Sequence, residues 1–276
     1  MNTKEVCSAL VLGIRDYFKK NNFSKAVIGL SGGIDSSVAA FLAVKAIGKK
    51  NVAGILMPDL KVTSKESIDD GLLAAKKLGI SHHIVPINES VQYFENIGRG
   101  FKIKPSSYAL ANAKARARMM ILYYFANLDD SLVIGTSDKS EIALGYTTKH
   151  GDNASDILVL GDLWKTEVIS LGKYLGVPGK ILKKKPSAEL VLGQSTEKEL
   201  GAPYEVLDKI LSMYIECGLS AKEIVLKGFD KKTVKNTAFR IRINEHKRRA
   251  AVLIRVSEKS FHGMEWRMPI TNKFNE

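Results

Sequence analysis

Short apolar runs alternate with longer segments of helical pattern along most of this chain. The apolar runs have the length of buried strands and cover residues 26–30, 51–57, 82–87 and 131–136. The helical patterns cover residues 35–48, 63–78, 108–128 and 163–177. Strands that alternate with helices predict a parallel sheet with helices on both faces. We therefore expect a Rossmann-like α/β fold, followed from about residue 186 by a polar helical extension at the C-terminus.

Capping residues mark several ends of these elements. Gly48 and Gly79 follow helical patterns, as glycines at helix C-termini do. Thr63 with Glu66 three residues later has the form of a capping box. Pro86 cannot donate a backbone hydrogen bond, so the third strand ends near it or lies at a sheet edge.

The segment GLSGGIDSS, residues 29–37, directly follows the first strand. Gly32 and Gly33 allow unusual backbone angles and let main-chain N–H groups approach an anion. The helix that starts near Asp35 or Ser36 adds unpaired N–H groups and a partial positive charge. The segment is either a phosphate-binding nest or a capped strand-to-helix turn. It matches neither the Walker A loop nor G-x-G-x-x-G.

A second polar segment, GTSDKSE at 135–141, directly follows the fourth strand. Ligands of open parallel sheets bind beyond the carboxyl ends of strands, near the point where the strand order reverses. We expect both segments to lie at that edge.

The charge of the chain favours anionic partners without choosing among them. The net charge is +13, and basic residues concentrate at 183–185 and 227–249. Such runs suit nucleic acid, phosphorylated metabolites or an acidic membrane, and they also fit a solvated basic face. Aromatic residues make up 8% of the chain and do not interleave with the basic ones, so we expect no nucleic-acid partner.

Cysteine usage and hydropathy favour a cytoplasmic protein. Cys7 and Cys217 form no CxxC pair, so they indicate neither a zinc site nor a disulfide framework. The N-terminal segment lacks the continuous apolar stretch of a secretion signal. No run of about eighteen apolar residues predicts a membrane span.

The loop at 29–37 carries S-G-G-x-D-S and resembles the pyrophosphate-binding loop of the N-type ATP pyrophosphatases. Later segments resemble, in order, the signatures of ammonia-dependent NAD synthetase: NAKARARMMILYYFA, GTSDKSEIALGYTTKHGDNASDI, GDLWKTEV, KKPSAELVLGQSTEKELG and EHKRR. This resemblance covers roughly residues 25–250. It implies that nicotinic acid adenine dinucleotide (deamido-NAD) is converted to NAD with ATP, magnesium and ammonia. It also implies a homodimer with the dinucleotide near the subunit interface.

The implied chemistry explains why such residues are needed. A carboxylate resists amidation because its oxygen is a poor leaving group, whereas adenylation makes that oxygen part of AMP. The carboxylate and the ATP α-phosphate are both anionic. Magnesium and basic side chains must therefore screen their repulsion and stabilise the departing pyrophosphate.

The resemblance implies roles for residues at matching positions. Asp35 and Glu141 match the magnesium carboxylates. The residues that match ATP contacts are Gly29, Leu30, Ser31, Gly32, Gly33, Ile34, Asp35, Ser36, Thr136, Lys165 and Ser187. Those that match deamido-NAD contacts are Arg116, Lys149, Asp156, His246 and Lys247. The implied catalytic residues are Asp35, Glu141, Lys165 and Asp156, with water as an alternative to Asp156 for taking the ammonia proton. Without the resemblance, helix caps or exposed side chains explain the same positions.

Helical spacing separates the basic residues of the segment at 108–128. Lys114, Arg116 and Arg118 are two apart and point in different directions, whereas Asn112 and Arg116 share a face. We therefore expect Arg116 to be directed at a ligand and the other two to be solvated.

Two positions depart from the family pattern. Asp138 stands where many members carry a neutral residue, and it adds negative charge near the ATP site. Glu189 stands where glycine is common, which leaves the backbone after Ser187 open. Separately, residues 257–270 are either a mobile loop over the substrate or an ordinary packed tail.

We expect one synthetase domain over residues 1–276 that uses free ammonia, because motifs begin near residue 25 and leave no room for an amidase domain. Another ATP pyrophosphatase, such as an amidating ligase or a tRNA-thiolating enzyme, is the nearest alternative. A basic RNA-binding protein is the alternative from a different class, and steeply salt-dependent binding would identify it.

Overall fold

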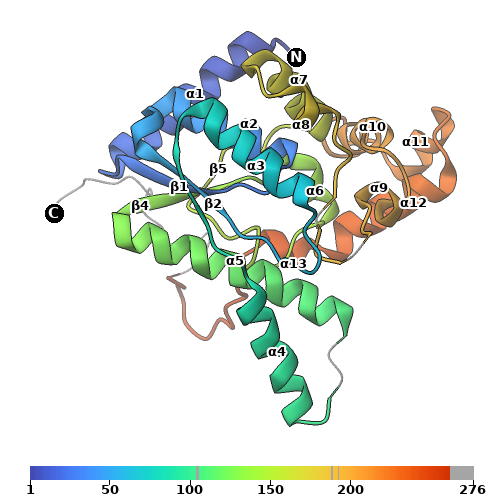
Figure 1. The fold of residues 1–276 in the computed structure, drawn as a ribbon. Helices are drawn as coiled ribbons and strands as arrows, with labels where there is room; N and C mark the ends of the chain where they lie inside the picture. The colour runs from blue at the N-terminus through green and yellow to red at the C-terminus, as the bar shows by residue number, and fades with distance from the viewer. Residues whose placement is uncertain (104–105, 188, 192, 262–276) are drawn as a thin grey trace.

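The structure is a computed structural model that describes residues 1–276 apart from 104–105, 188, 192 and 262–276. Its parallel strands form a sheet in the order β3-β2-β1-β4-β5 (Figure 1). The strands are β1 (Lys25–Gly29), β2 (Val52–Leu56), β3 (Ser81–Ile84), β4 (Ser131–Gly135) and β5 (Ile157–Leu158). The chain builds outward from β1 through β2 and β3, then continues on the other side of β1 with β4 and β5. The strand order therefore reverses between β1 and β4, where ligands of such sheets bind.

Helices connect and cover these strands. Those up to the end of the sheet are α1 (Thr3–Lys20), α2 (Ile34–Ile47), α3 (Lys65–Leu78), α4 (Asn88–Gly100), α5 (Ser107–Asp129) and α6 (Lys139–Leu144). Those beyond it are α7 (Lys165–Leu175), α8 (Gly179–Lys183), α9 (Thr196–Leu200), α10 (Tyr204–Ile215), α11 (Ala221–Leu226), α12 (Lys231–Ile243) and α13 (Glu245–Arg248). A 3-10 turn, η1, covers Lys49–Asn51. The Rossmann-like fold and the helical C-terminal extension are thus confirmed. Among the helices described, none is long and apolar enough to cross a membrane.

The larger core lies between the sheet and the helices α1, α2, α3 and α7. Alternation along β1 turns Ala26 and Ile28 toward these helices and Val27 toward the opposite face. α2 is buried along most of its length, and alanines such as Ala39 and Ala43 let its neighbours approach closely. This packing fixes the start of α2 against the end of β1.

The opposite face of the sheet is covered by α5, with α4 beside it (Figure 1). Val27 and Ile55 of the sheet pack with Ile121, Leu122 and Phe125 of α5. α4 was not predicted from the sequence, and Val91 is its only buried residue. β5, which contains two residues, was not predicted either.

The structure confirms the predicted end of one strand and contradicts the predicted cap of one helix. The expectation that Pro86 marks a strand end or an edge is confirmed, because β3 ends at Ile84 and lies at the edge of the sheet. The prediction of a capping box at Thr63 is wrong. Ser64 caps α3 by accepting a hydrogen bond from the Ser67 N–H, while the Thr63 hydroxyl accepts one from the Asp59 N–H.

The C-terminal helices α9 to α13 lie beside α6 and α7, at one end of the sheet (Figure 1). Residues 250–261 form neither helix nor strand and are mostly exposed. The loop expected at 257–270 falls largely outside the described residues, and Gly263 and Trp266 lie there.

Candidate active site

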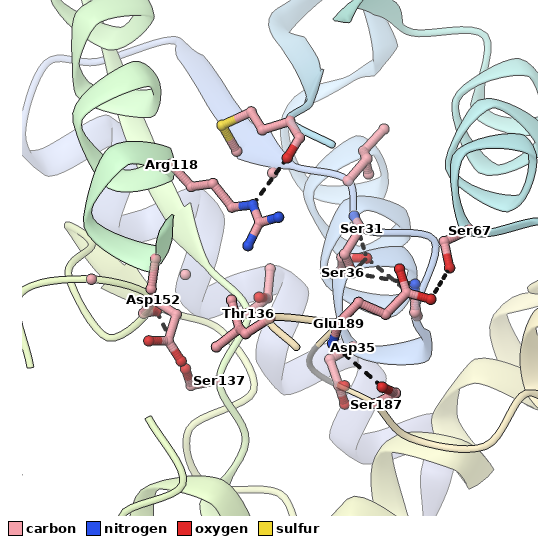
Figure 2. A pocket seen from close by; sticks show the side chains of 18 of the residues that line it. Ser31, Asp35, Ser36, Ser67, Arg118, Thr136, Ser137, Asp152, Ser187 and Glu189 are labelled. Atoms are coloured by element: carbon pink, nitrogen blue, oxygen red, sulfur yellow. Dashed lines mark hydrogen bonds between the residues drawn. The ribbon is translucent and has the colours of Figure 1, made fainter. Parts of the chain in front are cut away.

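A cavity of about 280 Å³ opens at the carboxyl ends of β1 and β4 (Figure 2). The loop after β1, the loop after β4, the α5 helix and the segment around Ser187 line it. Thr136 and Ser187 both lie in its wall, as do most residues of the loop at 29–36. The structure therefore brings together the residues that the sequence pattern assigned to ATP.

The loop after β1 is held in a tight turn by its small residues. Gly32 has φ +75°, and a Cβ atom there would lie 2.1 Å from the Ser67 carbonyl oxygen, so only glycine fits. The Ser36 and Ser37 hydroxyls both donate to the Gly33 carbonyl oxygen. α2 begins at Ile34 without a side-chain cap, which leaves N–H groups of its first turn available as donors, and residues 33–36 line the cavity.

Three carboxylates meet around one buried ammonium group. Lys165 Nζ lies 2.8 Å from oxygens of Asp35, Asp138 and Glu141. Oxygens of the three acids lie within 4.8 Å of one another. We call this group of four residues the acidic cluster. Asp35 is therefore not the cap of α2, and Glu141 is not a solvated surface residue.

Helix ends place the members of the acidic cluster. Asp138 caps α6, accepting a hydrogen bond of 2.8 Å from the Glu141 N–H. Glu141 is in the first turn of α6, and Lys165 is the first residue of α7. Asp35 comes from the first turn of α2. Three helix N-termini thus converge on the reversal point of the sheet.

The charge of the acidic cluster is unbalanced. Burial raises the pKa of Glu141 well above its usual value, against the opposing effect of Lys165. Burial likewise raises the pKa of Asp138 to about 6, with Lys165 opposing and Asp35 adding to the shift. Burial disfavours the charged form of Lys165, but the three carboxylates outweigh it and raise its pKa. In the described structure, Asp35 Oδ1 is buried without a hydrogen-bond partner.

Asp138 was treated in the sequence only as a departure from a family pattern. The structure makes it a buried member of the acidic cluster, with no exposed surface. The sequence did carry a signal, because Asp138 three residues before Glu141 has the spacing of an N-cap and an N3 acid.

Glu189 also lies in the cavity wall. Its φ of +45° is in the left-handed region, which agrees with a position that glycine can fill. Its carboxylate accepts hydrogen bonds from the hydroxyls of Ser67 at 2.5 Å and Ser64 at 3.1 Å. Both Glu189 and Ser36 of the loop after β1 line the cavity (Figure 2). A carboxylate therefore shares the cavity with that loop.

The residues matched to deamido-NAD divide into two groups. Arg116 is exposed, and its Nε donates to the Lys149 carbonyl oxygen at 3.2 Å. Lys247 Nζ donates to carbonyl oxygens of Gly145 and Thr147 at 2.6 and 2.8 Å. The loop at 145–149 thus links Arg116 and Lys149 with α13, where His246 is exposed.

Asp156 lies apart from these residues. Its Oδ2 accepts a hydrogen bond of 2.7 Å from the Val133 N–H, and its Oδ1 accepts one of 3.2 Å from the Tyr123 hydroxyl. Asp156 is not among the residues that line the cavity. Its carboxylate joins β4 to α5.

The expectation that Lys114 and Arg118 are solvated is wrong. Lys114 is buried, and its Nζ lies 2.8 Å from Asp59 Oδ2 and donates to the Leu190 carbonyl oxygen at 2.9 Å. Arg118 lines the cavity and donates to the Met57 carbonyl oxygen at 3.0 Å (Figure 2). These partners lie far away in the sequence, where helical spacing carries no information about them.

The fold and the site define an α/β protein with a cavity at the point where the strand order of a parallel sheet reverses, and with an acidic cluster beside the glycine-rich loop after β1. The chain belongs to the NAD synthase family, whose sequence model matches residues 6–251.

The chain is similar to both glutamine-dependent and NH(3)-dependent NAD(+) synthetases. It is 45% identical over 282 residues to the glutamine-dependent NAD(+) synthetase of Thermotoga maritima, covering 99% of this chain and 48% of that protein. It is 45% identical over 249 residues to the NH(3)-dependent NAD(+) synthetase of Methanocaldococcus jannaschii, covering 89% of this chain and 94% of that protein. The chain thus spans about half the length of the glutamine-dependent relatives.

A solved structure has the same fold. NMN synthetase from Francisella tularensis superposes with a TM-score of 0.82 at 35% sequence identity. The match covers 93% of this chain and 100% of that one.

Proposed function

We propose that this protein is an ammonia-dependent NAD synthetase that acts as a single catalytic domain. It adenylates the nicotinate carboxylate of deamido-NAD with ATP, and ammonia then displaces AMP to give NAD. Pyrophosphate is the second product of the adenylation. The observation that carries this proposal is the acidic cluster directly beside a phosphate-type loop, at the sheet edge where ligands bind.

The loop after β1 supports cleavage of ATP between its α- and β-phosphates. Its glycines, its serine hydroxyls and the first N–H groups of α2 provide donors for the pyrophosphate oxygens. Thr136 lies across the cavity from this loop and contributes a further hydroxyl. Lys165 contributes a positive charge that offsets part of the negative charge of the acidic cluster beside the phosphates.

The acidic cluster fits a magnesium ion. Asp35 and Glu141 would hold it, because magnesium prefers few carboxylates together with phosphate oxygens and water. The partnerless Asp35 Oδ1 and the excess of negative charge support this fit. When bound, magnesium screens the repulsion between the two anionic reactants and stabilises charge on the leaving pyrophosphate. Asp138 balances Lys165 and fixes the first turn of α6.

The dinucleotide site is proposed at Arg116, Lys149, His246 and Lys247. The loop at 145–149 connects these residues, and their charges suit a pyrophosphate-linked dinucleotide. Both Asp156 carboxylate oxygens already accept hydrogen bonds from the protein. We therefore propose that water, rather than Asp156, takes the proton from ammonia, and that Asp156 holds β4 and α5 together.

The nitrogen donor is proposed to be free ammonia. The 45% identity to the NH(3)-dependent NAD(+) synthetase of Methanocaldococcus jannaschii supports this donor, and the chain is equally similar to the glutamine-dependent enzyme of Thermotoga maritima. The alternative is ammonia delivered from glutamine by a separate unit.

A second candidate substrate follows from the likeness to NMN synthetase. Amidation of nicotinic acid mononucleotide would use the same adenylation chemistry on a smaller acid. A tRNA-thiolating activity has less support, because neither the buried Cys7 nor the exposed Cys217 lines the cavity.

Steady-state assays with matched substrates test the proposal. Purified protein receives ATP, magnesium and either deamido-NAD or nicotinic acid mononucleotide, with ammonium or glutamine as donor. We expect the highest kcat/KM with deamido-NAD and ammonium. A preference for the mononucleotide would establish the second candidate, and turnover with glutamine alone would overturn the choice of donor.

A further inference from the structure

The helix α10 belongs to the C-terminal extension, yet it packs directly on the elements that carry the acidic cluster. Tyr204, Leu207 and Leu211 of α10 form a buried group with Leu144 at the end of α6 and Trp164 before α7. The extension therefore shares a core with the two helices whose first turns hold Glu141 and Lys165.

Asp208 is the polar centre of this contact. It is buried, and its Oδ1 accepts a hydrogen bond of 2.6 Å from the Ser140 hydroxyl. Its Oδ2 accepts hydrogen bonds from the Thr166 N–H at 2.9 Å and from the Thr166 hydroxyl at 2.8 Å. The Ser140 Oγ in turn accepts a hydrogen bond of 2.9 Å from the Lys165 N–H.

These contacts supply what α7 lacks. Trp164 is at the N-cap position of α7 and provides no side-chain hydrogen bond to the first turn. The Lys165 and Thr166 N–H groups would otherwise have no acceptor within the helix. Asp208 and Ser140 provide these acceptors from other elements, and a carboxylate beside a helix N-terminus is also favoured by the helix dipole.

The same face of α10 contacts the reactive end of Lys165. Tyr204 lies one turn before Asp208, and its ring centre is 5.2 Å from Lys165 Nζ. One helix face thus contacts the Thr166 N–H, directly after Lys165, and the ammonium group of Lys165.

We propose that Asp208 is a positioning residue that holds Glu141 and Lys165 in register for the reaction. Ser140 directly precedes Glu141, and Thr166 directly follows Lys165. A single carboxylate therefore joins the first turns of α6 and α7, which must stay together for Lys165 Nζ to remain 2.8 Å from Glu141 Oε1. This inference rests on the proposed function for its kinetic readout only.

The test compares Asp208→Ala and Asp208→Asn with Val234→Ala. Val234 is a fully buried residue of α12 and packs with Ile210 and Ile224, away from the acidic cluster. It controls for loss of stability within the same extension. Asparagine preserves the volume at position 208 and can still accept from the Thr166 N–H. The amide nitrogen would then face the Ser140 hydroxyl, and it cannot accept a hydrogen bond from that hydroxyl.

The measurements are kcat and KM for each substrate, together with a crystal structure of each folded variant. For Asp208→Ala we expect kcat to fall roughly 10²-fold, the scale of a misplacement of about 1 Å, with much smaller changes in KM. Asp208→Asn should lie between this variant and the wild type, and Val234→Ala should keep the wild-type kcat while folded. The crystal structure of Asp208→Ala should show Lys165 Nζ displaced from Glu141.

A wild-type kcat in folded Asp208→Ala, or an unchanged contact between Lys165 and Glu141, would overturn the inference. If the alanine variant does not fold, the same two readouts apply to Asp208→Asn. If the wild-type protein does not amidate deamido-NAD, the proposed function fails separately, and the contact in the crystal structures still tests the inference.

Discussion

At the scale of single residues, the excess negative charge of the acidic cluster lowers the stability of the folded protein, and a bound cation would offset this effect. Three carboxylates share one ammonium group, which leaves an excess of two negative charges when all are ionised. Buried charge without compensation is unfavourable, and the raised pKa values of Asp138 and Glu141 express this cost. A site that is strained in this way until metal and nucleotide arrive suits a catalytic role.

Substitution of the proposed metal ligands tests that role. Asp35→Asn and Glu141→Gln should each weaken binding of Mn²⁺, used as a spectroscopic probe, and lower turnover at least about 10²-fold. Both variants keep the side-chain volume, and circular dichroism should show them folded. Asp16→Asn is a matched control, because Asp16 is exposed and forms a surface ion pair with Lys20. Wild-type Mn²⁺ affinity in both variants would contradict the assignment.

Substitution of Glu189 should strengthen ligand binding, whereas substitution of the proposed metal ligands should weaken it. Its carboxylate lines the same cavity as the phosphate loop, so it repels a polyphosphate. Glu189→Gln should bind ATP about fivefold more tightly without divalent metal, which corresponds to about 1 kcal/mol for two charges about 4 Å apart in water. Titration calorimetry at low salt measures this change, with Glu66→Gln as an exposed control outside the cavity lining. Equal or weaker binding would show that Glu189 does not oppose the nucleotide.

At the scale of elements, the buried pair of Lys114 and Asp59 joins α5 to the segment after β2. Burial raises the pKa of Asp59, but hydrogen bonds from Lys114 and the Lys61 N–H outweigh it and hold the pKa below its usual value. A carboxyl whose folded-state pKa is depressed contributes stability above its unfolded-state pKa. That stability is lost as the pH falls through the folded-state value.

Lys114→Met should therefore destabilise the protein in a pH-dependent way. At pH 7 we expect the free energy of unfolding to fall by about 3–5 kcal/mol, because Asp59 is left buried without its partner. The difference from the wild type should shrink as the pH is lowered below the usual range of a carboxyl pKa. Urea unfolding at several pH values measures it. Lys20→Met removes an exposed pair and should change stability by less than about 1 kcal/mol at any pH.

The sequence predicted elements well where they are long and regular. α2, α3, α5 and α7 were predicted within a few residues of their ends, because apolar periodicity and glycine caps mark them. α4 escaped notice although it is amphipathic: Phe94, Ile97 and Phe101 share one face that lies toward α5, but only Val91 is buried. Thr63 was mistaken for a cap because adjacent serine and threonine residues offer equivalent hydroxyls. Only the backbone shows that Ser64 is the one at the helix start.

At the scale of the whole molecule, α5 exposes a stripe of apolar side chains. Met120, Tyr124 and Leu128 are each more than 60% exposed and recur every four residues, one helix turn apart. Arg116 continues the same spacing. We propose that a second copy of the chain covers this stripe, which would place Arg116, proposed above to bind the dinucleotide, near a subunit interface.

Light scattering after size exclusion tests the proposed homodimer. The wild-type protein should have twice the mass of one chain. Tyr124→Glu should shift it toward the monomer, because a buried unpaired charge opposes association. Leu226→Glu changes another exposed apolar residue, on α11, and should leave the mass unchanged. A monomeric wild-type protein would rule out the dimer.

The candidate site was predictable only in part. Local motifs and positions near strand ends were enough to select several residues that line the cavity. These are the loop after β1, Thr136, Glu141, Lys165 and Ser187. The expectation that Lys114 and Arg118 are solvated was wrong because their roles depend on partners, such as Asp59, that the fold brings from elsewhere. Asp138 was expected to add negative charge near the ATP site, and its contact with Lys165 depends on the fold in the same way. No local sequence pattern marks Asp208, because its hydrogen-bond partners Ser140 and Thr166 lie on α6 and α7, which only the fold brings to α10.

Product stoichiometry tests the central claim most directly. The purified protein is incubated with ATP, magnesium, ammonium and deamido-NAD, and the nucleotides and pyrophosphate are quantified over time. We predict NAD, AMP and pyrophosphate in equal amounts, with no nucleotide cleavage when deamido-NAD is omitted. Formation of ADP and phosphate, or ATP cleavage that does not depend on deamido-NAD, would contradict the account.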